Sequence, residues 1–447
     1  MMGIGCWEEA VLSGKFKIIT LGCKVNQYES AFIEESLGRT GWHSAKDGAA
    51  PDIIVVNTCI VTQKAAHQSR QAIRKAIREN PGSRVAAIGC YVQVFPEELE
   101  AIDGLDLMAN NRAKVEIPRL LMEPPSPGEK TLVLPTFEPG TPFDLLDIKN
   151  FPGRTRAYLK IQDGCESFCT YCIVPYARGP YRSLAPQEVL RALEGFAKQG
   201  YREVVLTGIH LGKYGVDLPG NMDLKRLLQM AGKEGLPLRL RLSSLELREL
   251  EPEIIEMAAF EPWLCPHFHI PLQSGDNGIL KKMNRGYTTK EFTEKIKAVH
   301  AAIPWAGIGV DVMAGFPGED AKAQANCVSL LRDLPVSYLH VFPFSPRKGT
   351  PAWNFKNKVD VNTIKQRASE LRDLSRQKRI LFHEGCLGHV FDVLVEGPYA
   401  KDKTLMTGAG ENYLPFVFPR DDNLQGHIVK MRAGRIAGEK VLGEILD

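Results

Sequence analysis

The stretch QDGCESFCTYCIVPYARGPYRS, residues 162–183, places three cysteines within eight positions. Cys165, Cys169 and Cys172 supply three thiols, whereas a structural zinc site closes its tetrahedron with four ligands. Three thiolates can instead hold a 4Fe–4S cluster and leave one iron without a protein ligand. The spacing therefore predicts a cluster with one iron that is open to chemistry.

Length and composition are those of an ordinary globular chain. Its 447 residues exceed the size at which a single core keeps growing, so about two to four domains are expected. The composition, 44% hydrophobic and 24% charged, is typical of soluble proteins. The formal net charge of +3 excludes a uniformly basic nucleic-acid binder, although local basic stripes can still bind phosphate.

The ten cysteines are interpreted through the compartment that the sequence predicts. We find no signal peptide and no apolar run of about 18 residues, so a cytoplasmic protein with no membrane partner is expected. In a reducing compartment, clustered cysteines favour metal binding or catalysis over disulfides. The isolated Cys6, Cys265, Cys327 and Cys386 are expected to be buried as small hydrophobic residues.

Residues 14–120 alternate short apolar runs with helical stretches, which predicts an N-terminal parallel-sheet α/β domain. Three consecutive predicted strands end in Cys23, Cys59 and Cys90. Ligands of open α/β sheets bind beyond the carboxyl ends of the strands. Cysteine is also common inside buried strands, but that alternative would scatter it along them. The pattern therefore predicts that the three thiols share a metal site.

The rest of the chain divides into three predicted parts. Residues 121–150 are rich in Pro and Gly and lack helical periodicity, which suits an interdomain linker. Residues 151–383 contain six candidate βα units, which predict a barrel or partial barrel whose working face is formed by the strand C-termini. Residues 384–447 carry short runs punctuated by Gly, which predict a small β-barrel.

A predicted helix over residues 364–382 precedes that small barrel. One of its faces is apolar and comprises Ile364, Ala368, Leu371 and Phe382. An adjacent stripe is basic and comprises Lys365, Arg372, Arg376 and Arg379. A solvated helix face and a contact with an RNA backbone both remain open for this stripe.

The spacing Cys165-x-x-x-Cys169-x-x-Cys172 is the signature of radical S-adenosylmethionine (SAM) enzymes. Together with the cysteine-ended strands, it makes nearly the whole chain resemble the radical SAM methylthiotransferases. Further matching pieces are VVNTC, IGCYVQ, LTGIHLGKYG, RLSSLE, HIPLQSG, MNRGYT, DVMAGFPGE and FPFSPRKGTPA. The resemblance implies an α/β fold with the N-terminal three-cysteine domain, a central radical SAM partial (β/α)6 barrel and a C-terminal TRAM β-barrel.

The resemblance also implies two 4Fe–4S clusters and SAM as cofactors. Within the family, the barrel cluster cleaves SAM to a deoxyadenosyl radical, with an electron from a donor such as flavodoxin or ferredoxin. The cluster on Cys23, Cys59 and Cys90 would carry sulfur from a separate sulfur source. The positions that match the family's SAM contacts are Thr207, Gly208, Ser244, Glu246, Gln273, Asp311 and Phe342.

Within the family, LGCKVNQYES, KIQDGC and PYARGPYRS are most similar to the branch that methylthiolates carbon 2 of threonylcarbamoyladenosine at tRNA position 37. That chemistry requires the base to be drawn out of the anticodon loop. Arg178 and Arg182 are candidate contacts for phosphate or for the threonylcarbamoyl carboxylate, with surface solvation as the alternative.

Other substrates and other classes of protein remain as alternatives. The branch for isopentenyladenosine in tRNA more often has His where this chain has Tyr287, and the branch for a ribosomal protein lacks the PYARG pattern. A non-catalytic iron–sulfur carrier would not need the SAM motifs, and a zinc RNA-binding module fits three-ligand sites poorly.

Two features depart from the family pattern. Residues 1–13 extend past the expected start of the chain. Residues 386–447 hold seven Lys and Arg residues against nine Asp and Glu residues, so RNA contact would need a one-sided patch.

Overall fold

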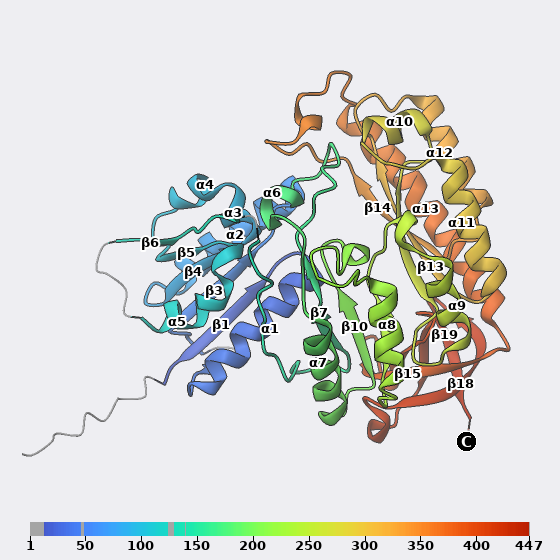
Figure 1. The fold of residues 1–447 in the computed structure, drawn as a ribbon, viewed down its shortest axis with the longest axis horizontal. Helices are drawn as coiled ribbons and strands as arrows, with labels where there is room; N and C mark the ends of the chain where they lie inside the picture. The colour runs from blue at the N-terminus through green and yellow to red at the C-terminus, as the bar shows by residue number, and fades with distance from the viewer. Residues whose placement is uncertain (1–12, 46–48, 124–128, 139, 447) are drawn as a thin grey trace, which may run out of the picture. The chain divides into compact units, whose positions relative to one another are not determined.

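The computed structural model describes residues 13–45, 49–123, 129–138 and 140–446 (Figure 1). The chain divides into two compact units. The first runs to Ile148 and also includes Tyr176–Arg178, and the second comprises Lys149–Pro175 and the chain from Gly179 onward. Cys6 and almost all of the N-terminal extension lie outside the described residues.

The first unit is built on a six-stranded parallel sheet, as the sequence predicts. The central strand Ile53–Thr58 is buried at every position, because helices cover both faces of a parallel sheet. In sheet order the strands are β2 (His43–Ser44), β1 (Lys15–Thr20), β3 (Ile53–Thr58), β4 (Arg84–Gly89), β5 (Leu107–Ala109) and β6 (Thr131–Val133). The helices are α1 (Lys24–Arg39), α2 (Gln63–Glu79), α3 (Cys90–Val94), α4 (Pro96–Glu100), η1 (Asn111–Glu116) and α5 (Ile117–Met122).

Part of the predicted linker, residues 121–150, belongs to this sheet. Strand β6 pairs in parallel with β5, and α5 extends to Met122. The segment is therefore not a linker throughout. Three residues of strand are too short to show a periodicity that could be recognised in the sequence.

The second unit contains a partial barrel of six parallel strands, as predicted. They form two three-stranded ladders that are connected by the isolated bridges Leu240↔Leu264 and Ser244↔His269. The strands are β7 (Ala157–Lys160), β10 (Glu203–Thr207), β11 (Arg239–Leu242), β12 (His267–Gln273), β13 (Gly307–Ala314) and β14 (Tyr338–Pro343). The main helices are α7 (Pro186–Lys198), α8 (Leu224–Lys233), α9 (Pro252–Phe260), α11 (Thr289–Ala302), α12 (Ala321–Asp333) and α13 (Val361–Cys386). Among the described residues, no ladder joins β14 to β7, so the barrel is open on that side.

Several short helices and strands lie in the segments that connect the barrel strands. Strands β8 (Gln162–Asp163) and β9 (Arg182–Ser183) form an antiparallel pair on either side of the cysteine loop. The others are α6 (Val174–Arg178), η2 (Leu211–Lys213), η3 (Leu247–Glu249), α10 (Asn277–Lys282) and η4 (Pro351–Asn354). No described helix is long and apolar enough to cross a membrane.

The chain ends in a small closed barrel, also as predicted. The strand order is β15 (Val390–Tyr399), β16 (Asp402–Gly410), β17 (Pro415–Pro419), β19 (Lys440–Ile445) and β18 (Ile428–Ala437), with η5 (Asp422–Leu424) between β17 and β18. Its core includes Phe391, Val393, Met406, Phe416 and Met431. Closure leaves no sheet edge unpaired.

Buried charges attach the small barrel to the strands of the partial barrel. Glu203 is fully buried and pairs with Arg239 and Arg241 at 2.8 Å each. Arg239 also donates to the carbonyl of Asp392 at 2.7 Å, and Arg241 to that of Glu411 at 2.8 Å. Since both guanidinium groups are satisfied from both sides, the two domains are held together within this unit.

The apolar face predicted for residues 364–382 is confirmed in helix α13. Ala368 and Leu371 are buried, and Ile364 and Phe382 are partly buried. The isolated cysteines Cys265, Cys327 and Cys386 are also buried, in agreement with their predicted packing role.

Candidate active site

The cysteines of the first unit lie where three adjacent parallel strands end. Cys23 follows β1 and caps α1, Cys59 follows β3, and Cys90 begins α3 directly after β4. Burial raises the pKa of the Cys59 thiol to about 12, and the nearby thiols of Cys90 and Cys23 contribute to the rise. Cys23, Cys59 and Cys90 thus follow neighbouring strands of one parallel sheet, at the edge where their carboxyl ends lie.

The backbone approaches these thiols closely at Gly22, where a side chain would collide with Cys59. Gly22 has φ +101°, and a Cβ atom there would lie 2.9 Å from the Cys59 Sγ. Asn111 donates from Nδ2 to the Cys90 Sγ at 3.4 Å, and Asn26 Nδ2 fixes the strand ends by donating to the carbonyls of Leu21 and Thr58. Three thiols in such a cradle are a donor set that fits a 4Fe–4S cluster.

Arg178 does not lie on the surface, which excludes the alternative of surface solvation. It is 1% exposed, and its guanidinium donates to Glu29 Oε1 at 2.6 Å and to Asn26 Oδ1 at 2.7 Å. Lys114 also forms an ion pair with Glu29. The backbone of the same segment is held as well, because Asn111 donates to the carbonyl of Ala177 at 2.6 Å. Arg178 is thus part of the wall of the first thiol site.

Arg182 is also buried, so the alternative of surface solvation does not apply to this residue either. It lies on β9, is 3% exposed, and donates to the carbonyl of Pro180 at 3.0 Å. Its guanidinium lies 3.7 Å from Asp163. Both arginines follow the cysteines closely in sequence, and only long-range packing decides that they turn inward.

The cysteines of the second unit lie on the loop between β8 and α6. The loop is folded on itself, since the Cys172 amide donates to the Cys169 carbonyl at 2.9 Å and the Cys165 amide to the Gly179 carbonyl at 3.0 Å. Burial raises the pKa of the Cys172 thiol to about 12, with further contributions from the other two thiols. The three cysteines share this one short loop, and three thiols are a donor set that fits a 4Fe–4S cluster.

Two residues that the sequence did not single out contact these thiols. His210 Nδ1 lies 3.6 Å from the Cys165 Sγ, and its Nε2 lies 2.6 Å from Glu249 Oε1. Arg285 donates from Nη1 to the Cys169 Sγ at 3.5 Å and to Glu246 Oε1 at 3.0 Å. Both lie in motifs that matched the family, LTGIHLGKYG and MNRGYT, which is the signal that could have identified them.

The residues predicted to bind SAM lie along the carboxyl half of the barrel strands. Glu246 is joined to the cysteine loop through Arg285. Gln273 adopts φ +67° at an irregularity in the β12–β13 ladder, which turns it away from the regular strand. The remaining members are Thr207 at the end of β10, Gly208 after it, Ser244 after β11, Asp311 within β13 and Phe342 within β14.

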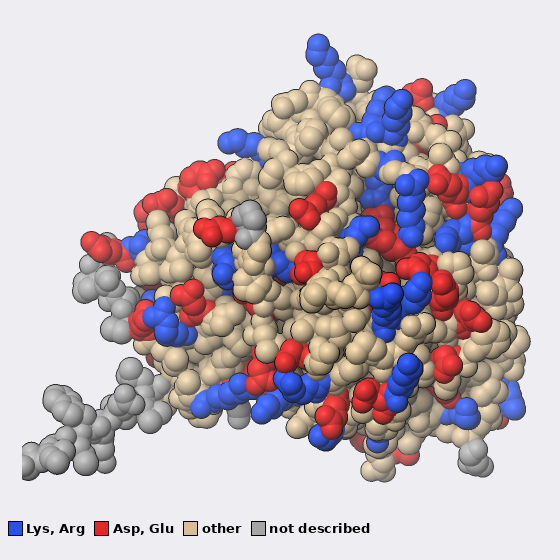
Figure 2. Space-filling view, in the orientation of Figure 1, with Lys and Arg blue, Asp and Glu red and all other residues tan. Residues whose placement is uncertain are grey.

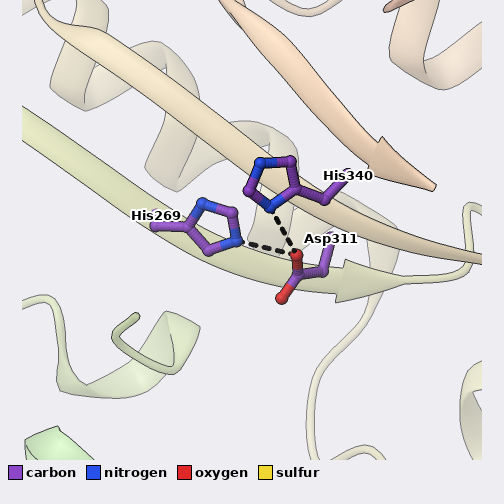
Figure 3. A group of neighbouring side chains, drawn as sticks. All are labelled: His269, Asp311 and His340. Carbon is purple, nitrogen blue, oxygen red and sulfur yellow. Dashed lines mark hydrogen bonds and ion pairs between the residues drawn. The ribbon is translucent and has the colours of Figure 1, made fainter. Parts of the chain in front are cut away.

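Asp311 has histidine neighbours that the sequence analysis did not predict. Figure 3 shows the imidazoles of His269 and His340 pointing at the Asp311 carboxylate from the strands on either side. His269 Nε2 lies 2.7 Å and His340 Nδ1 lies 3.5 Å from Asp311 Oδ1. These contacts hold the pKa of the carboxyl at about 2, although burial acts in the opposite direction.

The basic stripe of α13 is accessible. Lys365, Arg372 and Arg376 are exposed and Arg379 is partly exposed. Arg376 forms an ion pair with Asp373 on the same helix. Figure 2 shows that Lys and Arg side chains are interspersed with Asp and Glu side chains on the face drawn, in keeping with the small net charge.

Comparison with known protein families identifies two regions of the chain. The family described as uncharacterized protein family UPF0004 matches residues 15–110, and the radical SAM superfamily matches residues 159–326. The solved structure of TsrM, a radical SAM methyltransferase from Kitasatospora setae with cobalamin and a [4Fe-4S] cluster bound, is similar with a TM-score of 0.57. It is 15% identical and the match covers 76% of each chain, so it supports the fold alone.

Two curated relatives extend over nearly the whole chain. The threonylcarbamoyladenosine tRNA methylthiotransferase MtaB of Bacillus subtilis is 35% identical over 416 residues, which cover 92% of each protein. The tRNA-2-methylthio-N(6)-dimethylallyladenosine synthase of Carboxydothermus hydrogenoformans is 32% identical over 423 residues, which cover 93% of this chain and 96% of the relative.

These relatives are enzymes, so a non-catalytic iron–sulfur carrier and a zinc RNA-binding module are not supported. The two thiol sites agree with the 4Fe–4S clusters and SAM that the family implies. The chain belongs to the radical SAM methylthiotransferases.

Proposed function

We propose that this enzyme adds a methylthio group to carbon 2 of threonylcarbamoyladenosine at position 37 of tRNA. The observation that carries the proposal is the presence of two separate thiol sets, each at the carboxyl edge of an α/β unit. The similarity to MtaB over 92% of the chain supports the choice of substrate, and the relative that acts on dimethylallyladenosine is the second candidate.

We assign each proposed role to one of the domains expected from the sequence. Residues 14–120 would hold the sulfur-carrying cluster on Cys23, Cys59 and Cys90, and residues 151–383 would hold the SAM-cleaving cluster on Cys165, Cys169 and Cys172. When bound, the second cluster supplies the electron that cleaves SAM. Residues 384–447 would form the TRAM domain, and residues 121–150 would connect the first two domains while contributing β6 to the N-terminal sheet.

The residues around the second set of thiols would orient that cluster and SAM. Arg285 places a positive charge beside the Cys169 Sγ while Glu246 holds its guanidinium, so it would stabilise a thiolate there. Thr207, Gly208, Ser244, Gln273 and Phe342 would contact SAM from successive strands, which is the usual working edge of such a barrel.

We further propose that tRNA is held by α13 and the TRAM barrel. Lys365, Arg372, Arg376 and Arg379 would contact the phosphate backbone, which positions an RNA without specifying its sequence. The enzyme would draw electrons from a donor such as flavodoxin or ferredoxin and sulfur from a separate source. A tRNA-modifying enzyme of this kind would act in the cytoplasm.

Three substrates offered to the reconstituted enzyme test the proposal. They are tRNA with threonylcarbamoyladenosine, tRNA with isopentenyladenosine, and the ribosomal protein modified by the sister branch. Mass spectrometry of the nucleosides and of the protein is expected to show a methylthio group only on the first. Turnover confined to either of the others would overturn the substrate and leave the family unchanged.

A further inference from the structure

Two imidazoles and one carboxylate converge on a single point of the barrel wall (Figure 3). His269, Asp311 and His340 each present one ligand atom, and these atoms all lie within 4.8 Å of one another. The two imidazoles face the same carboxylate oxygen, Asp311 Oδ1, at 2.7 Å and 3.5 Å. In an ordinary hydrogen-bonded cluster, each imidazole could use a different oxygen. Here both imidazoles share one oxygen, so the three ligand atoms lie close to one another.

The sheet register explains this convergence. Asp311 and His340 are direct partners in the parallel pair of β13 and β14. His269 lies two residues before Pro271, which pairs with Asp311 across β12 and β13. Alternate residues of a strand share a face, so the three side chains project from the same side of three neighbouring strands. A site built on paired strands is held more precisely than one built on loops.

The Asp311 carboxylate lacks a permanent positive partner. Its side chain is 19% exposed, and no Lys or Arg among the described residues forms an ion pair with it. A largely buried carboxylate requires a counter-charge. A protonated imidazole or a bound cation can supply it. We propose that His269, Asp311 and His340 form a mononuclear binding site for a divalent first-row transition metal ion.

The residue behind His269 offers a partner for its second ring nitrogen, Nδ1. The Tyr338 hydroxyl lies 3.5 Å from His269 Nδ1 and is itself held by His267 Nε2 at 2.8 Å. A bound ion would replace the proton that His269 Nε2 shares with Asp311 Oδ1 at 2.7 Å, and the remaining imidazole proton would then lie on Nδ1, which faces Tyr338. Gly309 makes this arrangement sterically feasible, because a Cβ atom there would lie 2.4 Å from the Tyr338 ring.

The site is accessible and incompletely coordinated. The His340 side chain is 54% exposed, which gives an ion a path of entry. Two histidines and one carboxylate are a ligand set used for Zn²⁺ and Fe²⁺, and they leave at least one coordination position for a water or an oxygen ligand. The metal role differs from the SAM contact that the sequence predicted for Asp311, and it uses none of the six clustered cysteines.

Zinc is the probe for this site. The full chain is reconstituted with both clusters, incubated with Zn²⁺ and desalted, and its metal content and zinc X-ray absorption are measured. We expect one zinc per chain in addition to full iron, with only nitrogen and oxygen neighbours at about 2.0–2.2 Å. His340→Ala and Asp311→Asn are each expected to weaken zinc binding at least about 10-fold. His300→Ala, at an exposed position of α11, is the control and should leave zinc binding unchanged.

The proposal is overturned if the fully iron-loaded protein retains no zinc, or if sulfur neighbours at about 2.3 Å show that zinc sits on cysteines. Zinc retained equally by wild type and His340→Ala would also overturn it. Because His340 is more than half exposed, its replacement leaves the packed core intact and decides the matter even if Asp311→Asn does not fold.

Discussion

Gly22 and Arg178 show how single residues shape the first thiol site. Gly22 combines a left-handed backbone with a close approach to Cys59, two conditions that a side chain cannot meet together. Arg178 places a buried positive charge near the thiols, where it opposes the rise that burial causes in the pKa of Cys59. Gly22 avoids a collision with Cys59 because it has no side chain, and Arg178 provides a positive charge near the thiols.

Gly22→Ala is expected to prevent assembly of the first cluster without affecting the second. The reconstituted variant should therefore hold about four irons in place of about eight. Gly38→Ala is the matched control, because Gly38 lies in α1 and a Cβ atom added there would meet no atom within 4 Å. Full iron content in the Gly22 variant, measured by colorimetric assay, would show that this backbone position is not critical.

Arg178→Ala is expected to destabilise the first unit by about 3–5 kcal/mol, because it leaves Glu29 with one fewer buried partner. Hydrogen exchange of α1 amides under mild denaturant measures this loss. Arg191→Ala removes an exposed partner of Glu188 and should cost at most about 1 kcal/mol. If Arg178→Ala instead left stability unchanged and reduced the salt dependence of tRNA binding, a direct role of Arg178 in RNA contact would be supported.

At the scale of single elements, α13 has two different faces. Asp360 caps its start by accepting hydrogen bonds from the amides of Asn362 and Thr363, and its 26 residues run to Cys386. Ser375 on the inner face bonds the backbone of Leu339 in β14, so the helix is fixed against the barrel. The outer face carries the exposed basic stripe. The face of α13 that packs against the barrel is thus distinct from the basic face that we propose contacts tRNA.

His383, on the inner face, is expected to make stability depend on pH. Burial, with a smaller contribution from Arg379, lowers its pKa to about 4. The folded protein therefore resists protonation that the unfolded chain accepts near pH 6.5. The contribution is fully present above about pH 6.5 and is lost as pH falls towards 4, by about 2 kcal/mol at pH 5.

Comparing unfolding at pH 7.5 and pH 5 isolates this effect. His383→Gln should show a smaller loss of stability between the two pH values than the wild type does. His389→Gln, at an exposed position three residues after the end of α13, should behave like the wild type. An identical pH dependence in all three proteins would contradict the assignment.

Replacing Arg372, Arg376 and Arg379 with Glu is expected to weaken tRNA binding. Each lost phosphate contact should reduce the slope of log affinity against log salt by about one. The apparent Michaelis constant for tRNA should rise, while cleavage of SAM in the absence of RNA stays the same. Unchanged tRNA kinetics over a range of salt concentrations would leave the stripe as a solvated helix face.

At the scale of the whole molecule, the two thiol sets belong to different compact units. The chain leaves the second unit after Pro175, contributes Tyr176–Arg178 to the first, and returns at Gly179. Only three residues of sequence therefore separate Cys172 from Tyr176–Arg178, the segment that includes Arg178 beside the first thiol set. Separate sites should be separable by mutation.

The separation predicts two distinct phenotypes. Replacing Cys165, Cys169 and Cys172 with Ala should remove about half of about eight irons and abolish SAM cleavage. Replacing Cys23, Cys59 and Cys90 should also remove about half of the iron, but SAM cleavage should continue without a methylthio product. Iron and sulfide assays, together with chromatography of deoxyadenosine, measure both outcomes. A thiomethylated product from the second variant would show that the sulfur-carrying cluster is elsewhere.

The sequence alone determined the order of the elements, the family and the two cysteine sets. The alternation of apolar and helical runs specifies βα units, and parallel strands place their carboxyl ends at one edge. Cys23, Cys59 and Cys90 could therefore be grouped although 67 positions separate the first from the last. Cys165, Cys169 and Cys172 needed only their local spacing. Both inferences depend on chain connectivity and on regular geometry.

The tertiary structure decided which polar residues meet. Arg178 pairs with Glu29 across 149 positions, and His269 meets Asp311 across 42. Strand β6 was hidden in a Pro- and Gly-rich segment because three residues show no periodicity. These contacts depend on strand register and on the packing of distant segments. A charged side chain is buried only where the fold also supplies a partner of opposite charge or a hydrogen-bond partner. Strand register and the packing of distant segments cannot be deduced from a pattern of residue types, so only the folded structure reveals these contacts.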